Sequence, residues 1–241
     1  MSPTEPQHDS NFCFAVPSVL ENDRVRVTPF IPPIHLSTYF AASERHPEVY
    51  KYLPWGPFSS QEDLGHLVDK KFSKDPGYIL FAVFDKADPA PDESKSLGVI
   101  AGVIAYGGLP VLVEIGAVIV LPQVQRKDLA SNAVGLLLGY ALKLPTHPCF
   151  RGLRLAQRLG FQMEEILRWD RVLPAWKETD VGNGKGEREG DPRAGWLGRD
   201  TVMLSLCWDD WENGGRDKVA LLMQRGNNSP GVYAKPGIRR A

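Results

Sequence analysis

The chain has 241 residues, a length that suits one domain with a sizeable hydrophobic core. Hydrophobic residues make up 43% and charged residues 24%, which excludes a collagen, a coiled coil and a wholly disordered chain. Lysine and arginine number 28 against 29 aspartate and glutamate, so the formal net charge is -1. This balance argues against a broad nucleic-acid-binding surface, although it is compatible with a local basic patch.

The metal-binding residue types are scattered along the chain. Cys13, Cys149 and Cys207 lie far apart and form no CxxC pair, and the five histidines lack metal-ligand spacing, so no metal site is expected. The odd number of cysteines predicts reduced thiols in an intracellular protein. No segment reaches the ~18 consecutive apolar residues of a membrane span, and the polar N-terminus has no signal core. We therefore expect a cytoplasmic protein without a membrane partner.

The first 75 residues alternate between irregular and periodic segments. Residues 1–20 contain several prolines and little periodicity, which predicts a flexible N-terminal arm. The alternation over residues 24–28 predicts a strand, and a short helix is expected over residues 34–42 behind a run of prolines. A capping-box pattern at residues 59–62 precedes apolar residues at helical spacing up to residue 72, which predicts a second helix.

Three apolar runs then follow one another with short polar or glycine-containing connections. They span residues 78–84, 97–106 and 111–121. Short connections favour antiparallel neighbours, so these runs predict a three-stranded meander. Because the runs are apolar at nearly every position, we expect both faces of the meander to be covered.

A helix is most clearly indicated over residues 131–144, which are apolar nearly all round and should be buried against the sheet. Residues 155–159 are typical of the end of another helix, with Gly160 as its C-terminal cap. Residues 164–173 alternate as a strand.

The C-terminal part begins with a long glycine-rich segment. Residues 175–198 predict a loop much longer than the usual ~4–6 residues. A last strand over 201–208 and a helix over 218–225 are expected before a flexible tail at 226–241. One domain is therefore predicted over residues 21–225.

The connection over residues 120–131 has the composition of a phosphate-binding turn. A strand ends there, a polar loop follows, and the predicted helix begins with free backbone N–H groups and the positive end of its dipole. The loop contributes Gln125, Arg126 and Lys127, and the small Ala130 allows close approach of a ligand. The alternative is an ordinary helix-capping turn.

Three segments of the sequence resemble the GCN5-related N-acetyltransferases, and more narrowly the branch typified by ribosomal-protein N-terminal acetyltransferases. The E-I-G of residues 114–116 stands where that branch often has the same triplet. The Q-R-K-D-L-A of residues 125–130 stands at the acyl-CoA loop, where the family has Q/R-x-x-G-x-G/A. Residues 158–168 are similar to a late L-G-F segment followed by E-G and L-R.

The resemblance extends over roughly residues 23–212 and depends on the order of elements, since each motif alone is weak. The segments at residues 169–174 and 206–211 are most similar to fungal members. The implied fold is of the α/β class, with a mixed, mostly antiparallel central sheet flanked by helices: the acyl-CoA N-acyltransferase fold.

The resemblance implies that acetyl-CoA and an amine acceptor, a small molecule or a protein N-terminus, are the substrates. It assigns acetyl-CoA to the strand end, the loop and the first helical turn, namely Val118, Ile119, Val120, Gln125, Arg126, Lys127, Asp128, Leu129, Ala130 and Ser131. Glu114 is the candidate catalytic base. Its alternative role is that of a cleft carboxylate held by hydrogen bonds.

The sequence departs from the family pattern first at Asp128, which replaces a glycine of the loop motif. A carboxylate beside a pyrophosphate is repulsive, and aspartate lacks the freedom of glycine at positive φ. We expect Asp128 to cap the helix instead, leaving the neighbouring amides to bind phosphate.

The second departure is a shortage of chain after the buried helix. Only ten residues, with two prolines, separate Leu144 from Leu155, where the family has a strand and most of a helix. We therefore predict that this strand is absent or stunted, as if a block were deleted, and that the next helix lacks its first turns. An exposed sheet edge would favour a homodimer. The competing interpretations are a degenerate acyl-CoA-binding protein without turnover and a product that does not fold stably.

Overall fold

The computed structural model describes residues 12–51, 53–87, 99–109, 112–145, 149–152, 155–174 and 189–224. Within these residues eight strands form one sheet in the order β1-β2-β3-β4-β5-β6-β8-β7. The strands are β1 (Leu20–Glu21), β2 (Val25–Pro29), β3 (Tyr78–Asp85), β4 (Val99–Leu109), β5 (Leu112–Val120), β6 (Cys149–Gly152), β7 (Gln162–Leu173) and β8 (Leu197–Leu206). Only β5 and β6 are parallel neighbours, which confirms the mixed, mostly antiparallel sheet.

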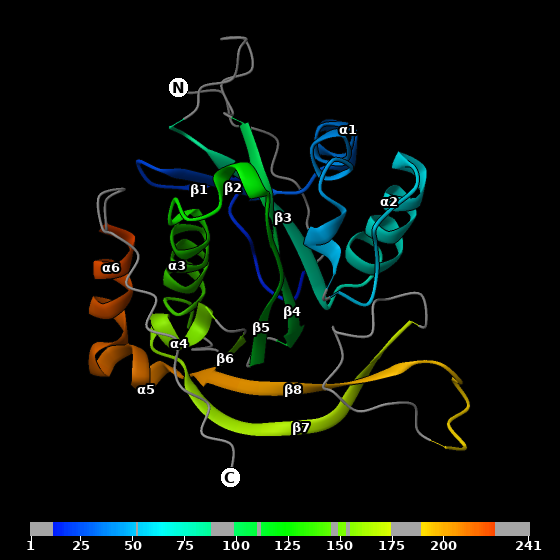
Figure 1. Cartoon of the computed structure of the whole chain (residues 1–241). Coiled ribbons are helices and arrows are strands. Elements are labelled where there is room, and N and C mark those ends of the chain that lie inside the picture. Colours follow the sequence, from blue (N-terminus) through cyan, green and yellow to red (C-terminus); the bar gives the residue numbers. More distant parts are fainter. Residues whose placement is uncertain are drawn as a thin grey trace.

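Helices cover both faces of this sheet. They are α1 (Pro32–Ser43), η1 (Pro47–Tyr50), α2 (Gln61–Val68), η2 (Asp69–Ser73), η3 (Pro122–Val124), α3 (Leu129–Ala141), α4 (Leu155–Leu159), α5 (Trp208–Asp210), η5 (Trp211–Gly215) and α6 (Arg216–Gln224). Figure 1 shows α3 and α6 on one side of the sheet and α1 and α2 on the other. None of the helices in the described part of the chain has the length and apolar character needed to cross a lipid bilayer.

The predicted meander forms the centre of the molecule as β3, β4 and β5. Register pairs such as Phe81 with Ile104 and Tyr106 with Ile115 join the three strands antiparallel. The strand β3 is buried from Ile79 to its end because helices lie on both of its faces. The buried helix that the sequence predicts is α3. The Tyr106 hydroxyl on β4 donates a hydrogen bond to the carbonyl oxygen of Leu137 on this helix.

The shortage of chain after α3 has the predicted effect. The strand β6 has four residues, and it pairs with β5 only at Leu112, Val113 and Glu114. The helix that follows, α4, has five residues. Within the described residues the strand is therefore stunted, and the helix is only five residues long.

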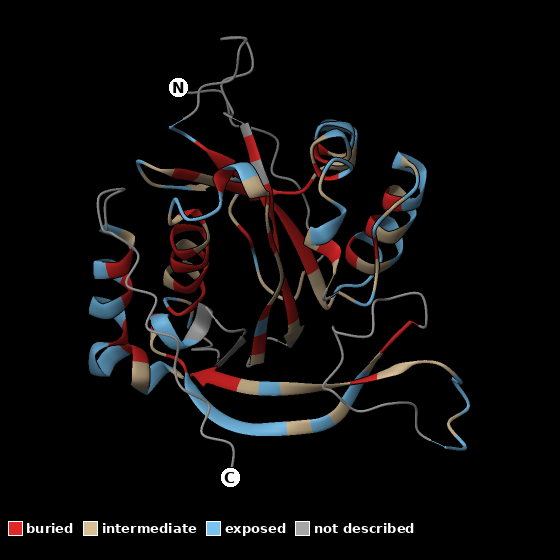
Figure 2. Cartoon of the chain, viewed as in Figure 1, coloured by how far each residue is buried: buried red, intermediate tan, exposed pale blue. Residues whose placement is uncertain are grey.

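The strands β7 and β8 form a long hairpin at the edge of the sheet (Figure 1). Both are longer than the sequence predicts: β7 begins at Gln162, and β8 begins at Leu197, inside the segment expected to be a loop. Residues 175–188 of that loop lie outside the described residues. The first half of β7 is exposed (pale blue in Figure 2), since the five-residue α4 cannot cover it.

The described part of the predicted N-terminal arm, from residue 12 onward, packs against the sheet and α3. The rings of Phe12 and Phe14 contact the ring of Tyr106 at centroid distances of 6.0 and 5.9 Å. Val16 is buried, and the carbonyl oxygen of Ala15 accepts a hydrogen bond of 2.6 Å from a tyrosine hydroxyl on α3. Burial of these apolar side chains offsets the entropy of ordering the segment. Residues 1–11 and the predicted tail at 226–241 lie outside the described residues.

Candidate functional site

The strand β5 is open along the second half of one edge. It pairs with β4 along nearly its whole length, but with β6 only as far as Glu114. Among the described residues, no strand pairs with this second edge over residues 115–120. Val118, Ile119 and Val120 therefore lie where backbone N–H and C=O groups can bind an extended ligand, as the resemblance implies for a pantetheine arm.

A β-bulge interrupts β5 within this open stretch. The register passes from Ala105–Gly116 to Val103–Ile119, so residues 117 and 118 of β5 face one residue of β4. Ala117 has a φ of 49°, in the left-handed region that disfavours residues with a Cβ. A bulge turns backbone polar groups out of the ladder, which makes this a candidate donor site for a carbonyl oxygen. The sequence carries no signal for it, since alanine is not a bulge-forming residue.

The loop between β5 and α3 also contains left-handed residues. Arg126 has a φ of 66° and Asp128 a φ of 58°. Asp128 thus adopts the conformation that a glycine would take at this position. Its side chain makes no capping hydrogen bond, so the prediction that it caps the helix is wrong. Left-handed turns before a helix N-terminus aim successive N–H groups into a concavity that suits an anion.

Hydrogen bonds fix this loop at both ends. The Gln125 side chain donates to the carbonyl oxygen of Val120 over 2.9 Å. At the other end the Asn132 amide donates to the carbonyl oxygen of Asp128 over 2.9 Å, and the Asn22 amide donates to the Asn132 side-chain oxygen over 2.7 Å. No local sequence pattern indicates either asparagine, because Asn22 lies 110 positions away from Asn132.

The remaining predicted cofactor residues divide by orientation. Leu129 and Ser131 are buried, so only their backbone groups face the N-terminal end of α3, while Ala130 is partly exposed. The Lys127 ammonium lies 3.9 Å from Oδ2 of the buried Asp85, an atom without a hydrogen-bond partner. Lys127 is therefore drawn toward the end of β3, while Arg126 is exposed.

Glu114 lies on β5 in one row with Tyr78 of β3 and Gly107 of β4, which are successive cross-strand neighbours. Its side chain is exposed. A Cβ on Gly107 would lie 2.6 Å from the Tyr78 ring, so the ring extends over this glycine toward β5. A Cβ on Gly116 would lie 3.4 Å from Oε1 of Glu114. The carboxylate of Glu114 therefore leans along the strand toward the bulge.

Two cations from other elements lie near Glu114. The ammonium of Lys71, on η2, is 5.4 Å from the centre of the Tyr78 ring. Burial is the main cause that lowers the pKa of Lys71, followed by Arg171, while Glu114 acts in the opposite direction. Burial also lowers the pKa of Arg199 on β8, and Glu114 again opposes the shift. In both cases the negative charge of Glu114 favours the charged form of the cation.

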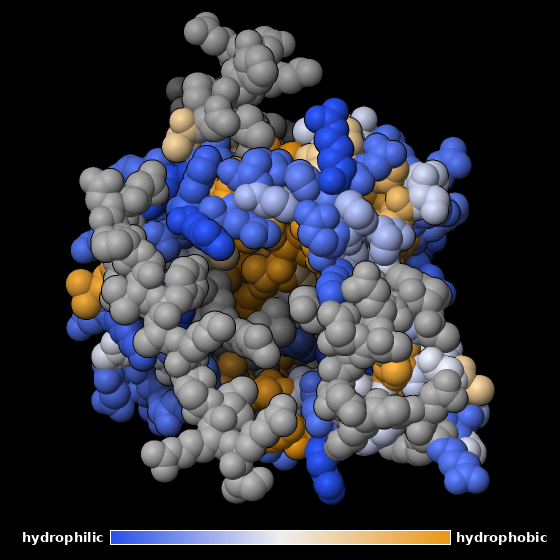
Figure 3. Space-filling model, viewed as in Figure 1, coloured by the Kyte–Doolittle hydropathy of each residue, from blue (hydrophilic) through white to orange (hydrophobic). Residues whose placement is uncertain are grey.

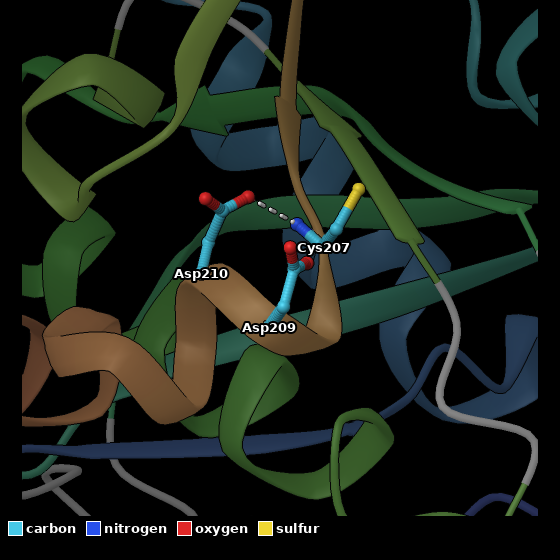
Figure 4. Close-up of side chains that lie close together, drawn as sticks. All are labelled: Cys207, Asp209 and Asp210. Carbon is cyan, nitrogen blue, oxygen red and sulfur yellow. Dashed lines mark hydrogen bonds between the residues drawn. The ribbon is translucent and has the colours of Figure 1, made fainter.

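Cys207, Asp209 and Asp210 form another cluster of chemically active groups (Figure 4). The Asp210 carboxylate accepts a hydrogen bond of 3.0 Å from the Cys207 backbone N–H, which completes a capping box at the start of α5. Cys207 is disulfide-bonded, so the prediction of reduced thiols is wrong for this residue. The cluster is explained as a helix cap, and its sulfur is not available as a thiolate ligand.

The surface is hollowed over β5. Figure 3 shows hydrophobic residues at the bottom of this hollow, with the hydrophilic loop that precedes α3 above it. The open edge of β5 and the loop thus lie at one depression of the molecule (compare Figure 1). A mostly apolar hollow with a few polar groups is the usual form of a small-molecule site.

Comparisons with known proteins find similarity at the level of structure. No family model and no curated protein sequence matches the chain. A GCN5-related N-acetyltransferase from Brucella melitensis superposes with a TM-score of 0.64 at 24% identity, over 85% of this chain and 85% of its own. A probable acetyltransferase of the GNAT family from Chromobacterium violaceum has a TM-score of 0.62 at 21% identity, over 88% of this chain and 98% of its own.

A spermidine N-acetyltransferase from Vibrio cholerae, in complex with CoA and spermine, gives a TM-score of 0.55 at 14% identity. The match covers 80% of this chain and 100% of that protein. At these identities the similarity defines the fold, which agrees with the strand order, the parallel β5–β6 pair and the helices on both faces. The chain has the acyl-CoA N-acyltransferase fold that these acetyltransferases share.

Proposed function

We propose that this protein is an acetyl-CoA-dependent N-acetyltransferase that transfers an acetyl group to the amine of a small molecule or a protein N-terminus. The observation that carries the proposal is the arrangement along β5. One strand holds an open edge, a bulge and a leaning carboxylate, and it leads into a loop with two left-handed residues before α3. The motifs at residues 114–116 and 125–130 support the ribosomal-protein N-acetyltransferase-like branch.

The residues present fit acetyl-CoA. The backbone of Val118, Ile119 and Val120 would hold the pantetheine arm, and the amides of residues 125–131 would hold the pyrophosphate. Glu114 and Val120 are six positions apart on one strand, about 20 Å. This length separates the phosphate end of the site from the acyl end, as an extended pantetheine arm requires.

Acetyl-CoA would supply an activated acyl group, whose transfer forms a nitrogen–carbon bond and releases the CoA thiol. Glu114 would take the proton that the acceptor amine loses, because its carboxylate is exposed and leans toward the bulge. The backbone donors at Ala117 would polarise the acyl carbonyl. The open edge of β5 would orient the two reactants. Holding them in the reactive geometry lowers the entropic cost of the transfer.

The competing function is acyl-CoA binding without turnover. The observation that favours it is the stunted β6, because a strand of only four residues forms one side of the proposed site. The carboxylate of Asp128 at the loop would also weaken phosphate binding.

A thermal-shift titration with acetyl-CoA, coupled to measurement of free thiol with a panel of amines, separates these functions. We expect a rise in melting temperature with acetyl-CoA concentration and amine-dependent thiol release. Stabilisation without release over the panel would support the binding protein. The Glu114→Gln variant should keep the acetyl-CoA shift and lose at least tenfold in thiol release, with Glu165→Gln, an exposed carboxylate on β7, as the matched control.

A further inference from the structure

We propose that the acceptor is a small zwitterion, an amine that also carries a carboxylate, bound between Glu114 and Lys71. This inference rests on the proposed function, since it names the acceptor class of the same site. It starts from the row of Tyr78, Gly107 and Glu114, which crosses three strands on the sheet face that carries α2 and η2.

The ammonium of Lys71 is held over this row. It lies 5.4 Å from the centre of the Tyr78 ring and 6.0 Å from that of Phe72. The Tyr78 ring extends over Gly107 toward Glu114, because Gly107 has no side chain to occupy that space. The Lys71 ammonium thus lies over a ring that extends toward the strand carrying Glu114.

The two charges do not neutralise one another. Among the described side chains, no carboxylate lies within ion-pair distance of the Lys71 ammonium, although Lys71 is partly buried. Glu114 is the cross-strand neighbour of Gly107, over which the Tyr78 ring lies, and its charge opposes the lowering of the Lys71 pKa. A partly buried ammonium and a carboxylate on the same face of the sheet, which do not pair with one another, can each bind a group of opposite charge.

The hairpin adds positive charge on the same side. Arg199 and Arg171 are direct cross-strand neighbours on β8 and β7, and Arg171 pairs with Asp170 at 3.3 Å. The charge of Glu114 also opposes the lowering of the Arg199 pKa. A polyamine, with an ammonium at each end, would place a positive charge against these cations. A zwitterion would place its ammonium at Glu114 and its carboxylate at Lys71.

Pairs of an amino acid and its decarboxylated amine test this directly. We would compare glycine with methylamine, phenylalanine with phenethylamine and lysine with cadaverine, together with spermidine and a peptide with a free N-terminus. Binding to the full chain in the presence of CoA would be measured by calorimetry, and thiol release at equal concentrations of free amine with acetyl-CoA. We expect at least one amino acid to bind at least tenfold more tightly than its decarboxylated partner.

The Lys71→Gln variant should lose most of this preference through a higher KM, and Lys71→Arg should retain it. Lys70→Gln removes an exposed cation from the neighbouring position and should change nothing.

Tighter binding of the decarboxylated amines, of spermidine or of the peptide would overturn the inference. The inference would also be overturned if neither member of any pair bound, or if the preference for amino acids survived in Lys71→Gln. Amino-acid binding without thiol release would uphold it and remove the proposed transferase activity. Thiol release with amines, but without a preference for amino acids, would support the transferase activity and overturn the inference of a zwitterionic acceptor.

Discussion

The two halves of the sheet differ in how extensively their strands are paired and in how far they are buried. In the N-terminal half, β3 and β4 pair over eight register positions, and β3 is buried from Ile79 onward. In the C-terminal half, β6 pairs over three positions on each side, and the first five residues of β7 are exposed. Met163 and Ile166, both apolar, are 61% and 55% exposed there.

The difference follows from how the chain length is distributed. Only ten residues lie between Leu144 and Leu155, and β6 takes four of them; α4 then begins at Leu155 and has five residues. A short α4 cannot cover the hairpin, and a short β6 cannot cover the second half of β5. The same shortage thus exposes apolar surface at β7 and opens the β5 edge at the proposed site. The first half should supply the stability, and the junction between the halves should supply the binding groups.

The largest expected effect is a difference in stability between matched truncations in the two halves. Phe81→Ala, at a side chain that is 1% exposed on β3, should lower the free energy of unfolding by about 3–5 kcal/mol because it leaves a cavity. Met163→Ala on β7 should change it by less than about 0.5 kcal/mol. Urea unfolding of both variants measures this. Equal losses would mean that the hairpin is as well packed as the meander.

A second prediction tests whether the acetyl-CoA loop depends on the well-packed half. Asn132 is fully buried and links Asn22, at the turn before β2, to the carbonyl oxygen of Asp128. Asn132→Ala removes both hydrogen bonds and should cost about 1–3 kcal/mol of unfolding free energy. It should also weaken acetyl-CoA binding, because the left-handed Asp128 loses its anchor. Unfolding curves and an acetyl-CoA titration measure the two effects.

The control for this experiment is Asn213→Ala, an exposed asparagine in η5 that is remote from the loop in sequence. It should change neither quantity. If Asn132→Ala destabilised the fold and left acetyl-CoA affinity intact, the loop would hold its conformation without support from the N-terminal half.

Local patterns in the sequence were enough to predict the elements that length and periodicity define. The meander and α3 follow from apolar runs that only a doubly covered sheet and a buried helix accommodate. The stunted β6 follows from a count of residues, since ten cannot form a complete strand and helix. The position of Asp128 directly before α3 also follows from its spacing in the sequence, but the side-chain cap expected of it is absent.

Other features depend on contacts between distant segments, and no local pattern indicates them. Phe12 and Phe14 of the proline-containing N-terminal segment pack on Tyr106, more than 90 positions away. The bulge at Ala117 arises from the pairing of two strands. Lys71 has the pattern of an exposed helical cation, and only the fold places it near Glu114.

The smallest expected effect concerns the loop that joins the two halves. Asp128 carries a negative charge and a φ of 58°, a combination that opposes phosphate binding by charge while it favours the cradle by shape. Asp128→Gly removes the charge and keeps the shape, because glycine adopts positive φ without strain. It should tighten acetyl-CoA binding about fivefold, which corresponds to ~1 kcal/mol. Asp128→Ala removes the charge but disfavours the left-handed conformation, so its gain in acetyl-CoA affinity should be smaller.

Calorimetric titration of both variants at low and high salt separates the two causes. The charge effect should shrink with salt, and the difference in affinity between the glycine and alanine variants should persist. Equal affinities for the wild type and both variants would show that the phosphate does not lie at this loop.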